Sequence, residues 1–157
     1  MVPRVSDKVV PLDQLRNYHG ILVHGVFDIL HIGHIRMLEA ARSLNLTIPL
    51  IVTVTADRFI QKGPGRPCFP APTRMECLEA LSCVDFISVV DEPTALTPIQ
   101  MIRPKFYVKG REYEGMGGIA KMEREAVLAW GGQVVYTERL ASSTKLVERV
   151  KQDLSNL

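Results

Sequence analysis

Apolar and polar residues follow two alternating periodicities along this chain of 157 residues. Apolar runs of about four to eight residues between turn-forming residues indicate buried strands, and apolar positions three and four residues apart indicate amphipathic helices. The pattern predicts buried strands at residues 20–25, 47–55, 85–90, 105–110 and 133–138. It predicts helices at residues 31–44, 73–84, 94–103, 117–132 and 142–154.

Local signals predict where several of these helices begin, end and bury their side chains. Thr73 followed three residues later by Glu76 is the pattern of a capping box and predicts a helix start at Thr73. Pro104 is expected to end helix 94–103, because the residue before a proline avoids the helical conformation. The apolar positions expected to face the core from the first helix are Ile32, Ile35 and Leu38.

Strands that alternate with helices favour a parallel sheet covered on both faces. The predicted fold is therefore α/β, a Rossmann-like, doubly wound sheet of five parallel strands. The sequence shows no repeat or linker, so residues 1–157 are expected to form a single domain. Ligands of such sheets bind beyond the carboxyl ends of the strands, where the strand order reverses.

Composition and charge argue against several classes of protein. The formal net charge is only +2 and the basic residues are dispersed, which does not suggest binding to nucleic acid. No apolar run approaches the ~20 residues that cross a bilayer, and the first residues do not have the pattern of a secretory signal. The three cysteines cannot all pair within the chain, which favours a reduced, cytoplasmic protein; they are Cys68, Cys77 and Cys83.

The segment VHGVFDILHIGH, residues 23–34, contains three of the four histidines of the chain. His31 and His34 lie three residues apart at the expected start of a helix, so both point toward its N-terminal end. The unpaired N–H groups and partial positive charge of that end attract phosphate, and Gly25 and Gly33 allow a ligand to approach the backbone. Imidazoles placed there can donate hydrogen bonds to charge that develops on a reacting phosphate.

Three other interpretations of the histidines remain open from the residues alone. The pair can be structural, or it can belong to a zinc site with His24 or Asp28 as a third ligand. It can also shuttle protons in a hydrolase, although no serine elbow or pair of carboxylates accompanies it.

Four ordered segments resemble the cytidylyltransferase-like nucleotidyltransferases. GVFDILHIGH (25–34) resembles the family signature Gly-Thr-Phe-Asp followed by His-x-Gly-His, and residues 62–87 resemble its lysine loop and its Arg-x-x-x-Leu segment. Residues 91–115 are similar to the adenylyltransferase domain of ADP-heptose synthases, and SSTKLVERV (142–150) resembles the Ser-Thr-Thr-Lys segment. The chain also resembles glycerol-3-phosphate cytidylyltransferases. Class I aminoacyl-tRNA synthetases have His-x-Gly-His as well, but this chain is too short for a synthetase.

The resemblance implies transfer of a nucleoside monophosphate from a nucleoside triphosphate to a phosphorylated small molecule, with release of pyrophosphate. ATP and a sugar phosphate are favoured by residues 91–115. Arg111-Glu112-Tyr113 departs from the Gly-Asp-Tyr of heptose enzymes, which leaves CTP with a phospho-alcohol or a phosphonate as an alternative. A non-catalytic nucleotide-binding module is a second alternative. Val26 replaces the usual threonine of the signature.

The resemblance also implies roles for particular residues. The expected catalytic residues are His31, His34 and Lys62, and the expected substrate-binding residues are Arg66 and Arg74. Those expected to bind the nucleotide are Gly25, Val26, Phe27, Asp28, Lys109, Gly110, Arg111, Ser142, Ser143 and Thr144. For Asp28, fixing the turn through backbone hydrogen bonds is an equally good role.

Mg²⁺ is expected to accompany the nucleotide, since the sequence shows no cage of metal ligands. The family commonly forms two-fold homodimers, and the apolar residues 80–90 are a candidate surface for one. The chain is alternatively one domain of a bifunctional enzyme.

Overall fold

The computed structural model describes residues 7–138, 148 and 151–152. The helices and strands are β1 (Ile21–Gly25), α1 (Ile32–Ser43), β2 (Leu50–Thr55), α2 (Ala71–Glu79), β3 (Phe86–Val90), α3 (Leu96–Ile102), β4 (Phe106–Gly110), α4 (Gly118–Ala129) and β5 (Gln133–Thr137). Three 3₁₀ turns accompany them, η1 (Leu12–Leu15), η2 (Asp57–Phe59) and η3 (Arg111–Tyr113). The predicted last helix and the predicted site residues Ser142, Ser143 and Thr144 lie outside the described residues.

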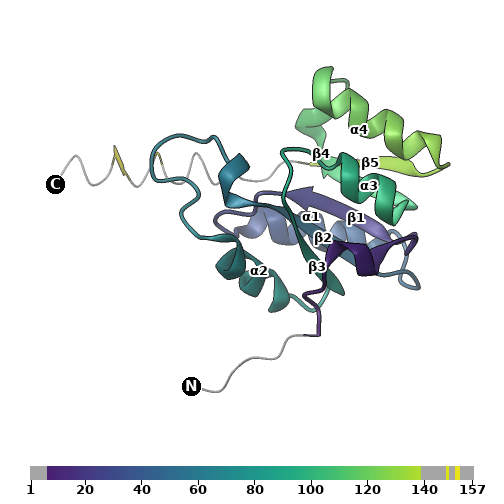
Figure 1. The fold of residues 1–157 in the computed structure, drawn as a ribbon, viewed down its shortest axis with the longest axis horizontal. Coiled ribbons are helices and arrows are strands. Elements are labelled where there is room, and N and C mark those ends of the chain that lie inside the picture. Colours follow the sequence, from purple (N-terminus) through teal and green to yellow (C-terminus); the bar gives the residue numbers. More distant parts are fainter. Residues whose placement is uncertain (1–6, 139–147, 149–150, 153–157) are drawn as a thin grey trace.

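The five strands form one parallel sheet in the order β3-β2-β1-β4-β5, which confirms the predicted Rossmann-like class (Figure 1). β1 pairs with β2 on one side and with β4 on the other, with Val23 opposite both Val52 and Val108. The order therefore reverses between β1 and β4. Ligands of doubly wound sheets bind at this point, beyond the carboxyl ends of the strands.

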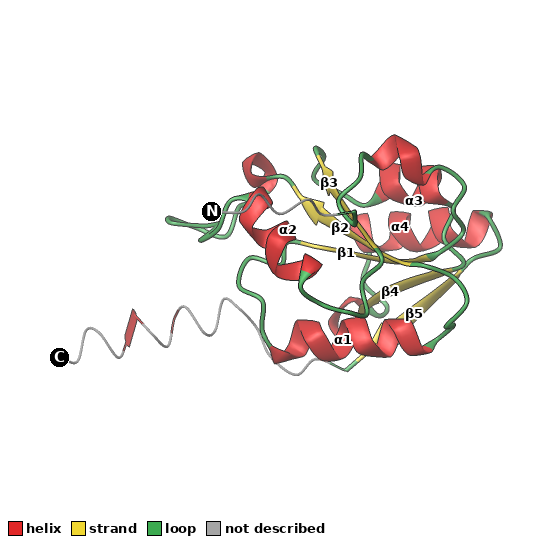
Figure 2. Cartoon of the chain, turned by 90° about the horizontal axis from the view of Figure 1, so that it is seen from below, coloured by secondary structure: helices red, strands yellow, loops and turns green. Residues whose placement is uncertain are grey.

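Helices cover both faces of the sheet, as Figure 2 shows with α1 on one side and α3 and α4 on the other. Alternate residues of a strand point to opposite faces, so β1 sends Ile21 and Val23 into one core and Leu22 into the other. The first core includes Leu38 of α1 and Leu78 of α2. The second core includes residues of η1, α3 and α4, namely Leu15, Ile99, Ile102 and Val127.

Two local predictions about helices were wrong. α2 begins at Ala71 after an N-cap at Pro70 and ends at Glu79, so Thr73 lies inside its first turn and does not cap it. Proline is suited to the start of a helix because its φ angle is already helical, and Pro70 and Pro72 set this start. On α1, Ile32 is 53% exposed, and the fully buried positions are Leu38 and Ala41.

The predicted end of α3 is confirmed at Pro104. The helix stops at Ile102, and Arg103 follows with a left-handed backbone, φ 52°. None of the helices in the part of the chain that the structure describes is both long and apolar enough to cross a membrane.

The apolar segment 80–90 contributes mainly to the interior of the chain itself. Val84, Ile87 and Val90 are buried, while Val89 is 41% exposed. The edge strand β3 is partly covered by the N-terminal segment, because Val10 N–H donates to the Ile87 carbonyl and Ile87 N–H donates to the Lys8 carbonyl. The homodimer stays a prediction.

Candidate active site

An open cavity of about 540 Å³ lies where the sheet order reverses, between the carboxyl ends of β1 and β4 and the start of α1. Many of the predicted site residues line it together: Gly25, Val26, Phe27, His31, His34, Lys62, Lys109 and Gly110. Its lining also includes His24, which the sequence offered only as a zinc ligand, and residues that sequence reasoning did not select, among them Glu112, Tyr113, Glu123 and Glu138. Asp28, Arg66, Arg74 and Arg111 are not part of this lining.

The two histidines of the motif cap helix α1 with their own rings. His31 Nδ1 accepts a hydrogen bond from Gly33 N–H at 3.1 Å, and His34 Nδ1 accepts one from His31 N–H at 3.4 Å. The rings stack with centroids 3.8 Å apart and planes 21° apart. Because Nδ1 accepts in both, a neutral ring carries its proton on Nε2. The pair is therefore held at the positive end of the helix dipole.

The His34 ring is uncharged at neutral pH. Its pKa is lowered to about 4, first by burial and then by electrostatic interaction with His31 and Lys62, while a hydrogen bond with the backbone of Ile29 works in the opposite direction. Phe27 packs against the ring with centroids 5.1 Å apart. A neutral imidazole here donates hydrogen bonds without adding a full charge.

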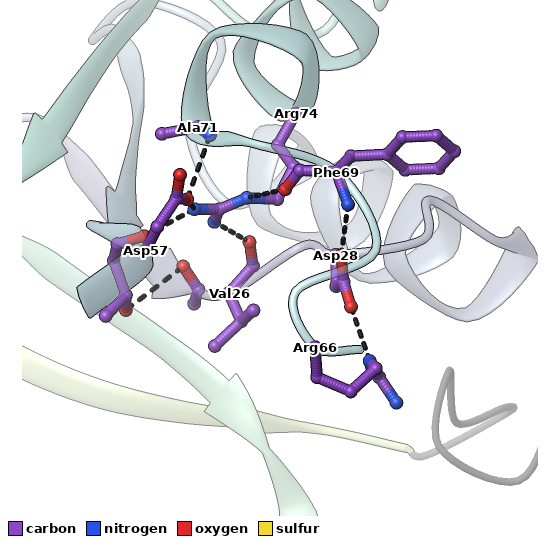
Figure 3. Close-up of polar contacts among 9 residues, drawn as sticks. Val26, Asp28, Asp57, Arg66, Phe69, Ala71 and Arg74 are labelled. Carbon is purple, nitrogen blue, oxygen red and sulfur yellow. Dashed lines mark hydrogen bonds and ion pairs between the residues drawn. The ribbon is translucent and has the colours of Figure 1, made fainter. Parts of the chain in front are cut away.

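Asp28 fastens the loop that carries Lys62 to the turn after β1. Its carboxylate accepts hydrogen bonds from Arg66 Nε at 2.6 Å and from Phe69 N–H at 3.1 Å (Figure 3). Burial by itself raises the pKa of Asp28, but bonds from the backbone of Cys68 and Phe69 and from Arg66 outweigh it and hold the pKa below its ordinary value. The side chains of Asp28 and Arg66 are 0% and 5% exposed, so the pair serves to join two segments.

Arg74 joins the same two segments and also contacts the end of β2. Its guanidinium donates to the carbonyls of three separate segments, namely Val26 after β1, Thr55 at the end of β2 (2.8 Å) and Phe69 in the loop (3.0 Å). It also pairs with the Asp57 carboxylate at 2.6 Å (Figure 3). Arg74 is 1% exposed, so its contacts favour a positioning role over direct binding of substrate.

The carboxyl end of β4 carries a second polar group. Lys109 Nζ lies 2.7 Å from the carboxylate of Glu123 on α4, and both residues line the cavity. Arg111 is not part of the lining, but it lies 3.0 Å from Glu138, which is, and its own side chain is 58% exposed. Glu123 has no signal in the sequence beyond its spacing, four residues before the buried Val127 on the same helix.

His24 forms part of the cavity floor at the end of β1. Its Nδ1 lies 2.9 Å from Thr53 Oγ1, and its Nε2 lies 3.2 Å from Thr55 Oγ1. Its pKa is lowered to about 4, chiefly by burial; Glu123 raises it and Lys109 lowers it by smaller amounts. In the part of the chain that the structure describes, no three His, Cys, Asp or Glu residues are grouped to hold a metal ion, so the zinc interpretation has no support there.

Comparison with known proteins defines the class. The sequence matches the model of the Cytidylyltransferase-like family over residues 22–149. The chain belongs to this family of nucleotidyltransferases.

Its relatives include bifunctional HldE proteins. The chain is 37% identical to bifunctional protein HldE of Streptomyces coelicolor over 158 aligned residues, which cover 96% of this chain and 33% of that protein. It is 36% identical to bifunctional protein HldE of Koribacter versatilis, with 94% of this chain and 32% of that protein covered. The chain thus spans about a third of the length of these relatives.

Solved structures share the fold. The lipopolysaccharide core biosynthesis protein of Thermoplasma volcanium has a TM-score of 0.60 at 24% identity, covering 78% of this chain and 97% of that one. The pantoate-beta-alanine ligase of Francisella tularensis has a TM-score of 0.57 at 14% identity, covering 87% of this chain and 68% of that one.

We expect Arg74→Ala to lower the free energy of unfolding by about 3–5 kcal/mol, because three carbonyls lose the donor that Arg74 supplies and Asp57 loses its ion pair, keeping only the bond from Ala71 N–H. Urea unfolding at pH 7 measures this value. Arg58→Ala is the control, since Arg58 pairs with Asp91 on the surface, with the two side chains 65% and 68% exposed, and its loss costs at most about 1 kcal/mol. Similar losses in both variants would contradict the role given to Arg74.

Because the pKa values of His24 and His34 are both lowered in the folded protein, we expect the protein to become less stable as the pH is lowered. The folded state holds His24 and His34 neutral down to about pH 4, whereas an unfolded chain protonates them near pH 6.5. Their contribution is therefore complete above pH 6.5 and is lost as the pH falls toward 4. As the pH falls from 6.5 to 5, protonation of each histidine in the unfolded chain should lower the free energy of unfolding by roughly 2 kcal/mol. His24→Gln keeps a donor and an acceptor for the two threonines and should flatten this decline; an unchanged decline would refute the assignment.

Proposed function

We propose that this protein transfers a nucleoside monophosphate from a nucleoside triphosphate to a phosphorylated small molecule and releases pyrophosphate. One observation carries the proposal: the stacked His31 and His34 rings occupy the start of α1 at the reversal of the sheet, in one cavity with Lys62. Family membership and the relation to HldE support it.

In this reaction an oxygen of the acceptor phosphate attacks the α-phosphorus of the triphosphate. A bond forms from that oxygen to the α-phosphorus, the bond to the bridging α,β oxygen breaks, and its electron pair leaves with pyrophosphate. The second pKa of a phosphate is about 6, so the acceptor is already ionised at neutral pH and needs no strong base. The enzyme has to neutralise charge and align the reactants.

The described residues supply those two requirements. The His31 and His34 rings and the first N–H groups of α1 donate hydrogen bonds to the phosphates, and Lys62 adds the full positive charge. Arg74 and the Asp28–Arg66 pair act indirectly, since they hold the Lys62 loop against the turn. The predicted nucleotide-binding residues Ser142, Ser143 and Thr144 lie outside the residues that the structure describes.

A magnesium ion fits this site only as a companion of the nucleotide. The carboxylates that line the cavity are Glu112, Glu123 and Glu138, and within the described residues they do not form a three-ligand group. Glu123 is already bound to Lys109. Mg²⁺ would therefore be held by phosphate oxygens and would supply charge neutralisation when bound.

ATP and a sugar 1-phosphate are the substrates we favour, as in ADP-heptose synthesis. The relation to bifunctional HldE proteins supports this choice. The positive charge of Arg111, which by itself favours a second phosphate or a phosphonate, is matched by Glu138 and by Glu114. The alternative, CTP with a small phospho-alcohol or a phosphonate, is therefore no longer supported by the charge of Arg111.

The choice of substrates is tested by the rate of pyrophosphate release. ATP and CTP are each paired with heptose 1-phosphate, glycerol 3-phosphate and a hydroxyalkyl phosphonate. We expect ATP with heptose 1-phosphate to exceed every CTP reaction by tenfold or more, because a base edge left unpaired costs about 1–3 kcal/mol. Preference for CTP without turnover of a sugar phosphate would overturn the choice. Nucleotide binding without any turnover would instead indicate a non-catalytic module.

Replacement of His34 tests the reaction centre. We expect His34→Ala to lower kcat by about 10²-fold or more with little change in folding, because the ring stabilises charge that develops only in the transition state. His19→Ala is the matched control, since His19 is exposed and bonds the Arg103 carbonyl outside the cavity. Turnover near the wild-type value in His34→Ala would remove the basis of the proposal.

A further inference from the structure

Glu123 is a buried carboxylate at the edge of the candidate site. Its side chain is 3% exposed, and it accepts hydrogen bonds from Lys109 Nζ at 2.7 Å, from Tyr107 OH at 3.0 Å and from Ala95 N–H at 2.9 Å. Burial acts to raise its pKa, but Lys109 and the two other donors outweigh that effect and hold the pKa below its ordinary value. Glu123 is therefore ionised.

Lys109 is held on several sides at the carboxyl end of β4. Its Nζ lies 4.3 Å from the centre of the Tyr113 ring and 5.5 Å from that of Tyr107, and its side chain is 14% exposed. Both members of the Lys109–Glu123 pair line the cavity that contains His31, His34 and Lys62. The positive charge at this end of the cavity is thus matched by a carboxylate.

Stability alone is a weak reason for such a pair. The cost of removing two charges from water offsets most of their attraction, and apolar residues of similar size often serve as well. The position of the pair matters more, because a charge in a partly dry cavity acts strongly on an anionic ligand. An unmatched Lys109 would compete with the start of α1 for the phosphates of a nucleotide.

We infer that Glu123 determines how the triphosphate lies in the cavity, by holding Lys109 in place and cancelling its charge. The phosphates are then drawn to His31, His34 and Lys62, and the end of the cavity at β4 is left for an uncharged part of a substrate. Glu123 is a positioning residue in this account. The inference rests on the proposed function, since it assigns an orientation to the substrate of that reaction.

The predicted effect of removing the carboxylate charge is a gain of affinity combined with a loss of turnover. Glu123→Gln keeps the size of the side chain and an acceptor for Ala95 N–H, but it leaves Lys109 with an unmatched charge. Anions then bind at both ends of the cavity. A merely structural role would weaken binding or lower the melting temperature, and it would not tighten binding of an anion.

The test is titration calorimetry with inorganic pyrophosphate, which needs no turnover. We expect Glu123→Gln to bind pyrophosphate about tenfold more tightly than the wild type, and Lys109→Met to bind it about tenfold more weakly. The double variant Lys109→Met, Glu123→Gln should return close to the wild-type affinity. Glu125→Gln is the matched control on α4, because Glu125 is 61% exposed and pairs only loosely with Lys121, and it should change nothing.

Kinetics complete the test and separate it from the proposed function. Glu123→Gln should lower both KM for the triphosphate and kcat, by about tenfold each. Unchanged or weaker pyrophosphate binding by Glu123→Gln would overturn the inference. If Glu123→Gln does not fold, the pyrophosphate affinity of Lys109→Met tests the inference in its place. An affinity equal to that of the wild type would then overturn the inference. A wild-type protein that releases no pyrophosphate from any triphosphate refutes the proposed function, whereas the calorimetric comparison still decides the role of the pair.

Discussion

The buried guanidinium of Arg74 is the interaction on which the shape of the candidate site depends. It donates to the carbonyls of Val26 just after β1, of Thr55 at the end of β2 and of Phe69 in the loop before α2. Buried carbonyls need donors, and here one side chain supplies three of them. The turn with the histidines and the loop with Lys62 are consequently parts of one hydrogen-bonded unit.

The electrostatics of the cavity depend on charged groups that are paired within the protein. His31 and His34 hold each other at the start of α1, and His34 is kept neutral chiefly by burial and then by electrostatic interaction with His31 and Lys62. Asp28 is bound by Arg66, and Glu123 is bound by Lys109. Most charges near the cavity are therefore internally matched. The positive end of α1, with Lys62 beside it, is where an incoming phosphate gains the most.

Much of the fold was predictable because its signals are local. Each strand is a short apolar run, and glycines or prolines mark most of the turns between strands and helices, so the elements and the parallel sheet followed from the pattern. The start of α2 was misjudged because Pro70 and Pro72 set it, whereas Thr73 only resembles a cap. The placement of Ile32 on the core face was also wrong, since the first turn of α1 lies at the open end of the sheet.

The site was predictable where its residues belong to short segments that resemble the family, such as the histidine motif, the loop with Lys62 and the segment with Lys109 and Gly110. The histidine motif lies within one turn, but Glu123 meets Lys109 only after α4 packs beside β4, and next to Arg124 and Glu125 it reads as part of a solvated face. Arg74 likewise looks like an exposed helix residue until the fold brings the distant carbonyls of Val26 and Thr55 to it. Long-range partners of this kind are fixed by tertiary packing, which a local pattern does not contain.

The central claim is that the turn from Gly25 to His34 holds the reacting phosphates. A crystal structure with a non-hydrolysable α,β-methylene nucleoside triphosphate tests it most directly. The account predicts phosphate oxygens within about 3 Å of the His31 and His34 rings and of the first N–H groups of α1, the length of ordinary hydrogen bonds. Phosphates seated against Lys109 at the end of β4, or outside the cavity, would contradict it.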